Sequence, residues 1–109
     1  MHKKLLSPIH PGEILREEFM KPLGLSANAL AQRLGVTAAR VNEIANGQRG
    51  ITADTALRLG RCFSSTPEFW MNLQQRYELE LARREVGVAV EREVEVLALV
   101  AEEVNAGHA

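Results

Sequence analysis

Apolar residues recur at three- and four-residue intervals along most of this chain, the spacing that places them on one face of an amphipathic helix. The first such stretch begins near Pro11. It is expected to end before Pro22, because a proline inside a helix lacks an N–H donor and clashes with the preceding turn. Its apolar stripe consists of Ile14, Leu15 and Phe19. The pattern predicts a first helix between the two prolines.

Two short helical patterns follow, and only three residues join them. The first of the two is expected to run from a cap at Ser26 to Leu34, and the next from a cap at Thr37 to Asn46–Gly47, where glycine accepts a left-handed conformation. A connection this short brings the two apolar faces together at a steep angle, and the small Ala31 permits a close approach. The spacing therefore predicts a helix-turn-helix.

Two further helices complete the predicted bundle. Thr52 can cap a fourth helix, whose inward residues are expected to be Ala56, Leu57, Leu59 and Phe63. A fifth helix is expected to begin with Thr66 as cap and Pro67 at its first position, and it is the longest. Its apolar stripe consists of Phe69, Trp70, Leu73, Tyr77 and Leu81. The predicted fold class is therefore all-α.

The C-terminal stretch carries two conflicting patterns. The valines of residues 86–90 alternate with other residues as in a strand. A helical spacing follows at Val90, Val94, Leu97, Ala101 and Val104. We expect a helix from about Glu91, and the pattern leaves open a bent helix, a short strand or a linker over residues 86–90.

Composition indicates one globular domain, since 109 residues with 46% hydrophobic and 25% charged side chains are ordinary for a single core. We expect an N-terminal arm (1–8), a helix-turn-helix domain (9–85) and a C-terminal extension that is helical and dimerising (86–109). Cys62 has no partner for an internal disulfide, no apolar run is long enough for a membrane span, and the first residues lack a secretory pattern. A cytoplasmic protein is expected.

Charge is distributed unevenly along the chain. Residues 1–50 carry seven basic and four acidic side chains, a net charge of +3. Residues 51–109 carry six basic and ten acidic side chains, a net charge of −4, and the whole chain has a net charge of −1. A positive half is suited to face phosphate, and an acidic half is suited to face a basic protein partner.

The third predicted helix presents a small, polar outer surface when Val41 and Ile44 point inward. The candidate base-reading residues are Ala38, Ala39, Arg40, Asn42, Glu43 and Asn46. Asparagine can pair with adenine, arginine with guanine, and an alanine methyl can touch thymine in a major groove. Glu43 has two possible roles, accepting from cytosine or orienting Arg40 one turn earlier. On residue types alone, the alternative is an ordinary solvated helix surface.

Residues Ile9 to about Arg84 resemble the HigA family of antitoxins, within the phage-repressor-like helix-turn-helix proteins. The resemblance rests on three segments: HPGEILREEF, LAQRLGVTAARVNEIANGQRGITADTALRLGRCF and TPEFWMNLQQRYELELARRE. It implies a compact bundle of the lambda-repressor-like type, with a long fifth helix and an extra C-terminal helix or extension. It also implies a protein that binds operator DNA, represses its own operon and neutralises a small HigB-type toxin, itself similar to ribosome-dependent mRNA endonucleases.

By the same resemblance, the recognition helix falls on residues 37–46, and the amides that begin the preceding helix face a phosphate. The implied phosphate-contacting residues are Ser26, Asn28, Gln32, Arg33, Thr37 and Arg49. Arg49 is the best candidate among them. Ala38 and Ala39 stand where many phage repressors carry glutamines, so the operator sequence cannot be carried over.

The C-terminal half contains more apolar surface than a small helical domain can bury, which favours a partner. The residues assigned to a homodimer are Leu73, Tyr77, Leu81, Val90, Val94 and Leu97. The acidic residues that remain for a basic toxin are Glu78, Glu80, Glu91, Glu93 and Glu95. The alternative is that the tail only completes its own domain.

No spacing of histidine, cysteine or acidic residues resembles a metal site, and no catalytic constellation is visible. We therefore expect no enzyme, no cofactor and no small-molecule ligand. His10 is expected to help start the first helix, and Cys62 to act as a small buried hydrophobe. Two alternatives to the antitoxin stay open: a stand-alone transcription regulator of the same fold, and an interaction module that has lost DNA binding.

Overall fold

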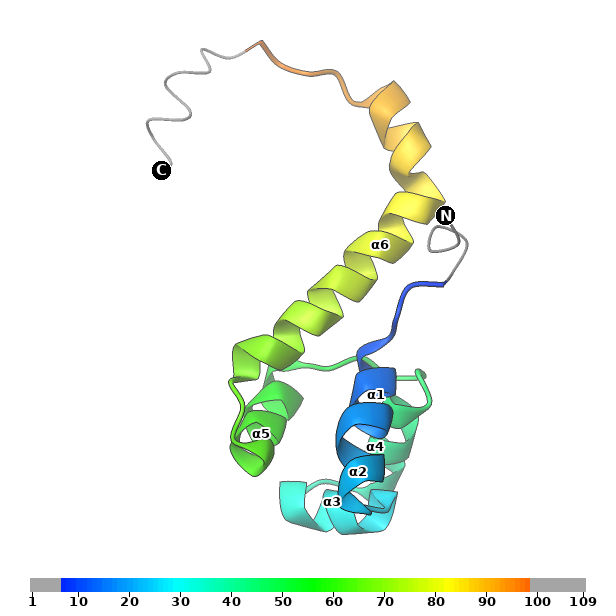
Figure 1. The fold of residues 1–109 in the computed structure, drawn as a ribbon. Helices are drawn as coiled ribbons and strands as arrows, with labels where there is room; N and C mark the ends of the chain where they lie inside the picture. The colour runs from blue at the N-terminus through cyan, green and yellow to red at the C-terminus, as the bar shows by residue number, and fades with distance from the viewer. Residues whose placement is uncertain (1–6, 99–109) are drawn as a thin grey trace.

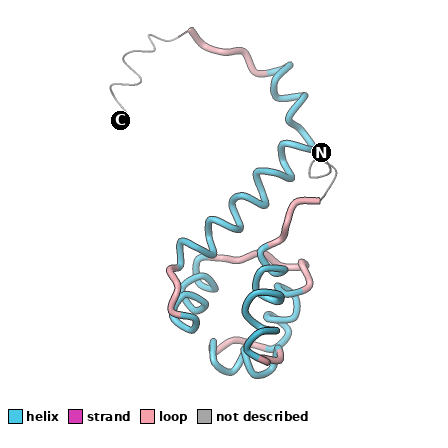
Figure 2. The backbone as a smooth tube through the Cα atoms, in the orientation of Figure 1, coloured by secondary structure: helices cyan, strands magenta, loops and turns pink. Residues whose placement is uncertain are grey.

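The computed structural model describes residues 7–98, and every regular element among them is a helix (Figures 1 and 2). The elements are α1 (Pro11–Ile14), a π-helical segment η2 (Leu15–Met20), α2 (Lys21–Leu23), α3 (Ala27–Leu34), α4 (Ala38–Ala45), α5 (Ala53–Phe63) and α6 (Pro67–Glu93). No helix in this part of the chain is long and apolar enough to cross a membrane. The prediction of an all-α fold is confirmed.

α1, η2 and α2 form one continuous helix, so the expectation that the first helix ends before Pro22 is wrong. The main chain widens ahead of the proline: the Lys21 N–H donates to the Arg16 carbonyl, five residues earlier. A π-helical turn of this kind shifts the carbonyl ladder that a proline ring would otherwise meet. The helix ends instead at Gly24, whose φ of 64° lies in the left-handed region.

Hydroxyl side chains start the four remaining helices, as predicted. Each accepts a hydrogen bond from the main-chain N–H three residues further on. These caps are Ser26, Thr37, Thr52 and Thr66. Gly35 ends α3 with a φ of 74°, and Thr37 already caps α4. The three-residue connection and the helix-turn-helix are thus confirmed.

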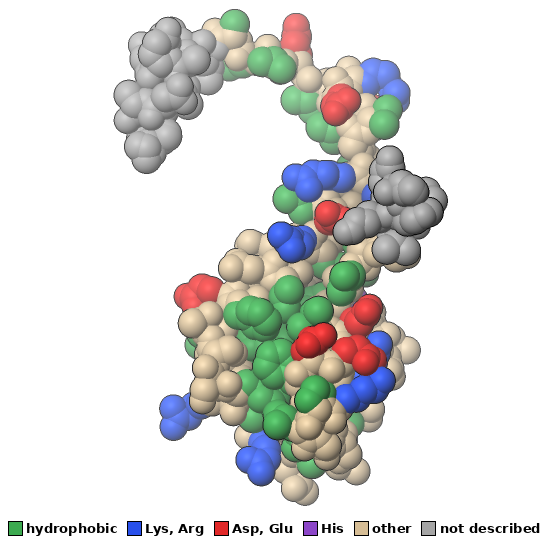
Figure 3. Space-filling model, in the orientation of Figure 1, with side chains coloured by type: hydrophobic (Ala, Val, Ile, Leu, Met, Phe, Trp, Pro, Cys, Tyr) green, Lys and Arg blue, Asp and Glu red, His purple; other side chains and the backbone are tan. Residues whose placement is uncertain are grey.

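The core lies where α3, α4 and α5 meet the first helix and the start of α6, and Figure 3 shows apolar side chains gathered on the face that α1, α5 and α6 share. Its buried apolar residues are Leu15, Met20, Leu30, Ala31, Leu34, Val41, Ile44, Ala45, Ile51, Ala56, Leu59 and Trp70. Trp70 is fully buried, and its indole N–H donates to Ser65 Oγ at 3.1 Å. Because of this hydrogen bond, the large indole ring can be buried in the core without leaving its N–H donor unpaired.

Two predicted inward residues point outward. Leu57 is 62% exposed, because it follows the fully buried Ala56 and is rotated by about 100° from it on α5. Phe69 is 39% exposed for the same reason, one position before Trp70 on α6. Assigning these two residues to the core was wrong, and both add apolar area to the surface.

α6 extends without interruption through residues 86–90 to Glu93, so neither the strand nor the linker applies there. The expected helix from about Glu91 is also wrong for the described residues, because Val94 has an extended conformation and residues 95–98 carry no helix. Adding residues to an existing helix avoids the cost of nucleation, which favours continuation over a new start. Figure 1 shows the end of α6 projecting beyond the bundle. Ala101 and Val104 lie outside the described residues.

Candidate nucleic-acid interface

α4 presents the polar surface that the pattern predicts. Val41 and Ile44 are buried, as expected, and Ala45 is buried beside them. The outward residues fall into an exposed set, Ala39, Asn42 and Asn46, and a half-buried set, Ala38, Arg40 and Glu43. The exposed set lies on one side of a rigid helix, which is the arrangement that base-edge contacts require.

The first helix fixes the C-terminal end of α4. A Cβ atom at Gly12 would lie 1.7 Å from the Ile44 carbonyl oxygen, so only glycine allows α1 to cross there. The Arg16 guanidinium donates a short hydrogen bond to the Ala45 carbonyl, one of the acceptors that a helix end leaves without an internal partner. Sequence reasoning missed both residues. The available signal was a glycine in the first turn of a predicted helix.

His10 starts α1, as expected: its Nδ1 accepts the Gly12 N–H at 2.8 Å. The imidazole ring also meets the Tyr77 ring edge-on, with centroids 4.8 Å apart, and so joins the start of α1 to α6. Burial lowers the pKa of His10 below its ordinary value, because the charged form loses hydration there. The neutral form is also the one whose Nδ1 can accept the hydrogen bond.

Arg40 binds the start of α5. Its Nη2 lies 2.9 Å from Asp54 Oδ1 and 2.7 Å from Thr55 Oγ1. Asp54 also accepts from Arg58 Nε at 2.7 Å, and the hydrogen bonds from Arg58 and then Arg40 lower the pKa of this exposed carboxyl. The guanidinium of Arg40 thus ties α4 to α5 in the free protein.

Glu43 pairs with Arg49 and does not orient Arg40, so that alternative is wrong. Arg49 places Nε at 2.8 Å and Nη2 at 2.7 Å from Glu43 Oε1. Arg40 is instead drawn to Asp54, the acid at the start of α5. The arginine and the glutamate of this pair remain 50% and 40% exposed, so the pair adds little stability and the arginine can exchange its partner for a phosphate.

The other candidate phosphate residues come from α3 and its connection to α4. Ser26 and Thr37 accept main-chain hydrogen bonds as caps, which leaves each hydroxyl proton available for a phosphate oxygen. Asn28 and Gln32 are exposed on α3. Arg33 is also exposed, but it lines a hollow on the side of α5, which it shares with Leu34, Leu57, Arg58, Arg61 and Cys62.

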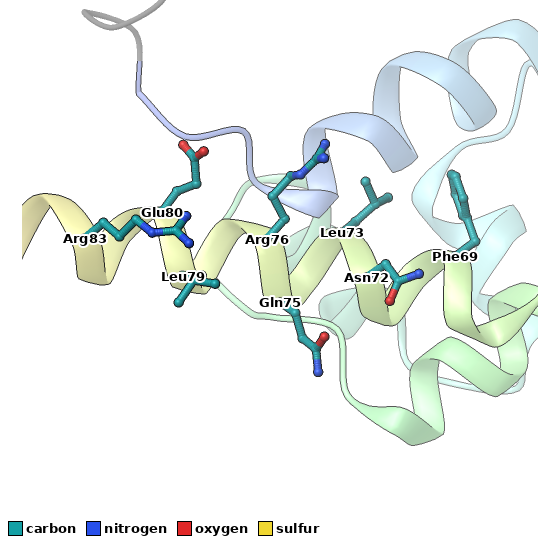
Figure 4. Close-up of a pocket in the computed structure, with 8 residues that line it drawn as sticks. All are labelled: Phe69, Asn72, Leu73, Gln75, Arg76, Leu79, Glu80 and Arg83. Carbon is teal, nitrogen blue, oxygen red and sulfur yellow. The ribbon is translucent and has the colours of Figure 1, made fainter. Parts of the chain in front are cut away.

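The predicted dimer residues divide between two surroundings. Leu73, Tyr77 and Leu81 are half-buried, and Leu73 packs against the core. Val90, Val94 and Leu97 are exposed. A further side of α6 forms a shallow hollow, and Figure 4 shows the residues that line it: Phe69, Asn72, Leu73, Gln75, Arg76, Leu79, Glu80 and Arg83. The sequence did not single out Phe69 and Leu79 as exposed apolar residues of this surface.

Among residues 7–98, no group of three or more histidine, cysteine or acidic side chains is placed to hold a metal ion. Cys62 is half-buried and makes no disulfide. Around α4 and its connection to α5, side-chain hydrogen bonds of Arg40, Arg49 and Gln74 fix main-chain and side-chain positions.

A family model described as Helix-turn-helix matches residues 17–70. The chain is 55% identical to virulence-associated protein I of Dichelobacter nodosus over 83 residues, which are 76% of this chain and 77% of that protein. It is 38% identical to the antitoxin HigA-1 of Vibrio cholerae over 79 residues, 72% of this chain and 74% of the relative.

A solved structure of the Pseudomonas aeruginosa antitoxin HigA with the higBA promoter superposes with a TM-score of 0.81 at 52% identity, covering 83% of this chain and 98% of that one. High identity, nearly complete coverage of the relative and a matching helical arrangement agree with the sequence resemblance. The chain belongs to the HigA family of helix-turn-helix antitoxins.

Proposed function

We propose that this chain is a cytoplasmic antitoxin that binds operator DNA as a dimer, represses its own operon and neutralises a HigB-type toxin. The observation that carries the DNA-binding part is the exposed face of α4, with Asn42 and Asn46 outward and Arg49 beside it. The promoter present in the structure of the Pseudomonas relative supports the same ligand. Toxin neutralisation is inferred from the family.

A dimer follows from the size of one recognition helix. A single helix contacts too few base pairs for tight binding, and two copies related by a two-fold axis can occupy successive major grooves about 34 Å apart. α6 supplies exposed apolar area that such a pairing would cover, including Leu79, Val86 and Val90. Its exposed acidic residues, Glu91 and Glu93 among them, remain for a basic toxin.

Footprinting on the DNA upstream of this operon tests the proposed geometry. We expect symmetric protection of two half-sites about one helical turn apart. Protection of one isolated half-site at every protein concentration would contradict the dimer.

Two substitutions separate base recognition from phosphate contact. Asn42→Ala should cost roughly 1–3 kcal/mol on the operator and little on random duplex, because a base contact carries sequence information. Arg49→Ala should weaken binding to both duplexes and reduce the salt dependence by about one phosphate. Titrations at several salt concentrations measure both effects. Equal losses on both duplexes for Asn42→Ala would mean that this residue contacts no base edge.

Arg40→Ala is a separate case, because Asp54 and Thr55 hold this guanidinium in the free protein. If Arg40 leaves them to bind guanine, its substitution should reproduce the operator-specific loss of Asn42→Ala. If it stays, the substitution should lower the melting temperature and affect both duplexes alike.

The neighbouring gene and its product distinguish an antitoxin from a stand-alone regulator. A small basic reading frame next to this gene, whose product arrests growth alone and forms a complex with this chain, would support the antitoxin. Operator binding without such a partner would favour the regulator.

A further inference from the structure

The loop between α4 and α5 is held by a side chain from a distant helix. Its first residues still belong to the end of α4: the Gly47 and Gln48 N–H groups donate to the carbonyls of Ile44 and Glu43. From Arg49 to Ile51 the main chain makes one hydrogen bond in the described part of the chain. The Ile51 N–H donates to Gln74 Oε1 of α6 at 2.7 Å.

Gln74 is bound at both ends of its carboxamide. While Oε1 accepts from the loop, Nε2 donates to Glu78 Oε2 at 2.7 Å, one turn further along α6. Gln74 is 8% exposed, whereas Glu78 is exposed. Burying an amide is unfavourable unless its polar atoms are paired, and here both are.

The lack of a side chain at Gly50 makes room for this contact. A Cβ atom at that position would lie 2.9 Å from Gln74 Nε2, closer than real Cβ atoms come to other atoms, and 3.0 Å from Oε1, so the carboxamide would have to shift. The glycine therefore lets the carboxamide reach the loop main chain. The two ends of the contact lie in separate segments of the sequence, NGQRG and NLQ, and neither segment indicates the other by spacing.

We infer that Gln74 is a positioning residue for the nucleic-acid interface: from α6 it fixes the loop that presents Arg49, and Glu78 in turn fixes Gln74. The inference rests on the proposed function and assigns to α6 a part in DNA binding that involves no contact with DNA. A glutamine suits this position because it accepts and donates at once. A carboxylate would repel Glu78, and an apolar side chain would leave the Ile51 N–H buried and unpaired.

The test replaces Gln74 by methionine, which keeps the length and packing of the side chain and removes both hydrogen bonds. Gln74→Met should weaken binding to operator and random duplex by the same factor, roughly fivefold to tenfold, and lower the salt slope by about one phosphate. Gln75→Met is the matched control, because Gln75 is the next residue, is exposed and lines the hollow on another side of α6. It should leave both affinities unchanged.

A double substitution shows whether Gln74 acts through Arg49. In the Arg49→Ala chain, Gln74→Met should cause no further loss, because the group that it positions is already absent. Losses that multiply in the double variant would overturn the inference, as would an equal loss for Gln75→Met.

Amide hydrogen exchange at Ile51 reports the contact without DNA. Exchange at this amide should be faster in Gln74→Met and, to a smaller degree, in Glu78→Ala. Because Glu78 is exposed, Glu78→Ala should fold even if Gln74→Met does not. Unchanged exchange in both variants, with normal operator binding by the wild-type chain, would overturn this inference alone. Failure of the wild-type chain to bind any duplex would overturn the proposed function and the inference together.

Discussion

The two halves of α6 both combine apolar and charged residues, and their apolar side chains have opposite surroundings. In the first half, Trp70 and Gln74 are buried, and Tyr77 is half-buried against His10. In the second half, Val86, Val88 and Val90 are 47%, 73% and 47% exposed. Both halves are helical without interruption.

The difference separates helix formation from burial. Once the first half is nucleated by its cap and its packing, the second half adds one hydrogen bond per residue and needs no core of its own. Its valines are then apolar area without a partner inside residues 7–98. We conclude that the first half of α6 serves the chain's own core, and that the second half is available to another molecule.

The largest expected effect of a single substitution is at Trp70, which the core surrounds completely. Trp70→Ala should lower the free energy of unfolding by about 3–5 kcal/mol, because it leaves a large cavity and removes the hydrogen bond to Ser65. Val88→Ala in the second half of α6 should change the free energy of unfolding by less than about 0.5 kcal/mol. Chemical denaturation of both variants checks the contrast, and similar losses would show that the second half is buried in solution.

Replacing glycine by alanine should lower the stability of the fold at Gly12 and raise it at Gly87, in the second half of α6. Gly12→Ala places a methyl group against the Ile44 carbonyl and should destabilise by about 1–3 kcal/mol, by forcing α1 away from α4. At Gly87 the nearest atom to an added Cβ is Arg83 Cβ at 3.9 Å. Gly87→Ala should therefore stabilise by up to about 1 kcal/mol, the helix-propensity difference. Thermal melts measure both, and destabilisation by Gly87→Ala would indicate a close neighbour at this position.

A smaller effect is expected from pH, through His10. Its pKa in the folded chain is lowered from 6.5, so the unfolded chain binds the proton more readily. The contribution of the neutral imidazole is complete above pH 6.5 and decreases as the pH falls from there towards the folded-state pKa. Melting temperatures should therefore fall on acidification through this window.

The control for this pH effect is His10→Asn, which keeps a capping acceptor and does not titrate. It should flatten the pH dependence between neutral and mildly acidic conditions. An equal fall in the melting temperature of this variant would assign the acid sensitivity to other groups.

The smallest effect on the fold is expected from truncation after Arg84. The removed part contains no buried residue among those described, so the free energy of unfolding should change by less than about 0.5 kcal/mol. If the second half of α6 pairs two copies of the chain, sedimentation should show a smaller species, and operator affinity should fall. An unchanged oligomeric state and full operator affinity in the truncated chain would show that the residues after Arg84 have no role in the dimer.

Local chemistry made part of the structure predictable. The caps at Ser26 and Thr37 and the glycines at positions 35 and 47 act within one or two turns, so their effect could be inferred from neighbouring residues alone. The same holds for the inward direction of Val41 and Ile44, and hence for the outward face of α4. Which of the outward residues contact a base stays a prediction.

Contacts between distant segments could not be inferred in this way. Arg40 had acidic candidates on its own helix and elsewhere, and only the packing of α4 against α5 brought it to Asp54 and left Glu43 to Arg49. The same is true of Gln74, whose acceptor reaches the main chain of a loop 23 residues earlier.

The sequence by itself determined where most helices begin and which face of α4 stays outside, because caps and apolar spacing act over a few residues. The tertiary structure alone decided which polar groups pair across helices and where burial ends along α6. Those outcomes depend on the distances between elements, and such distances are set by the packing of the whole core.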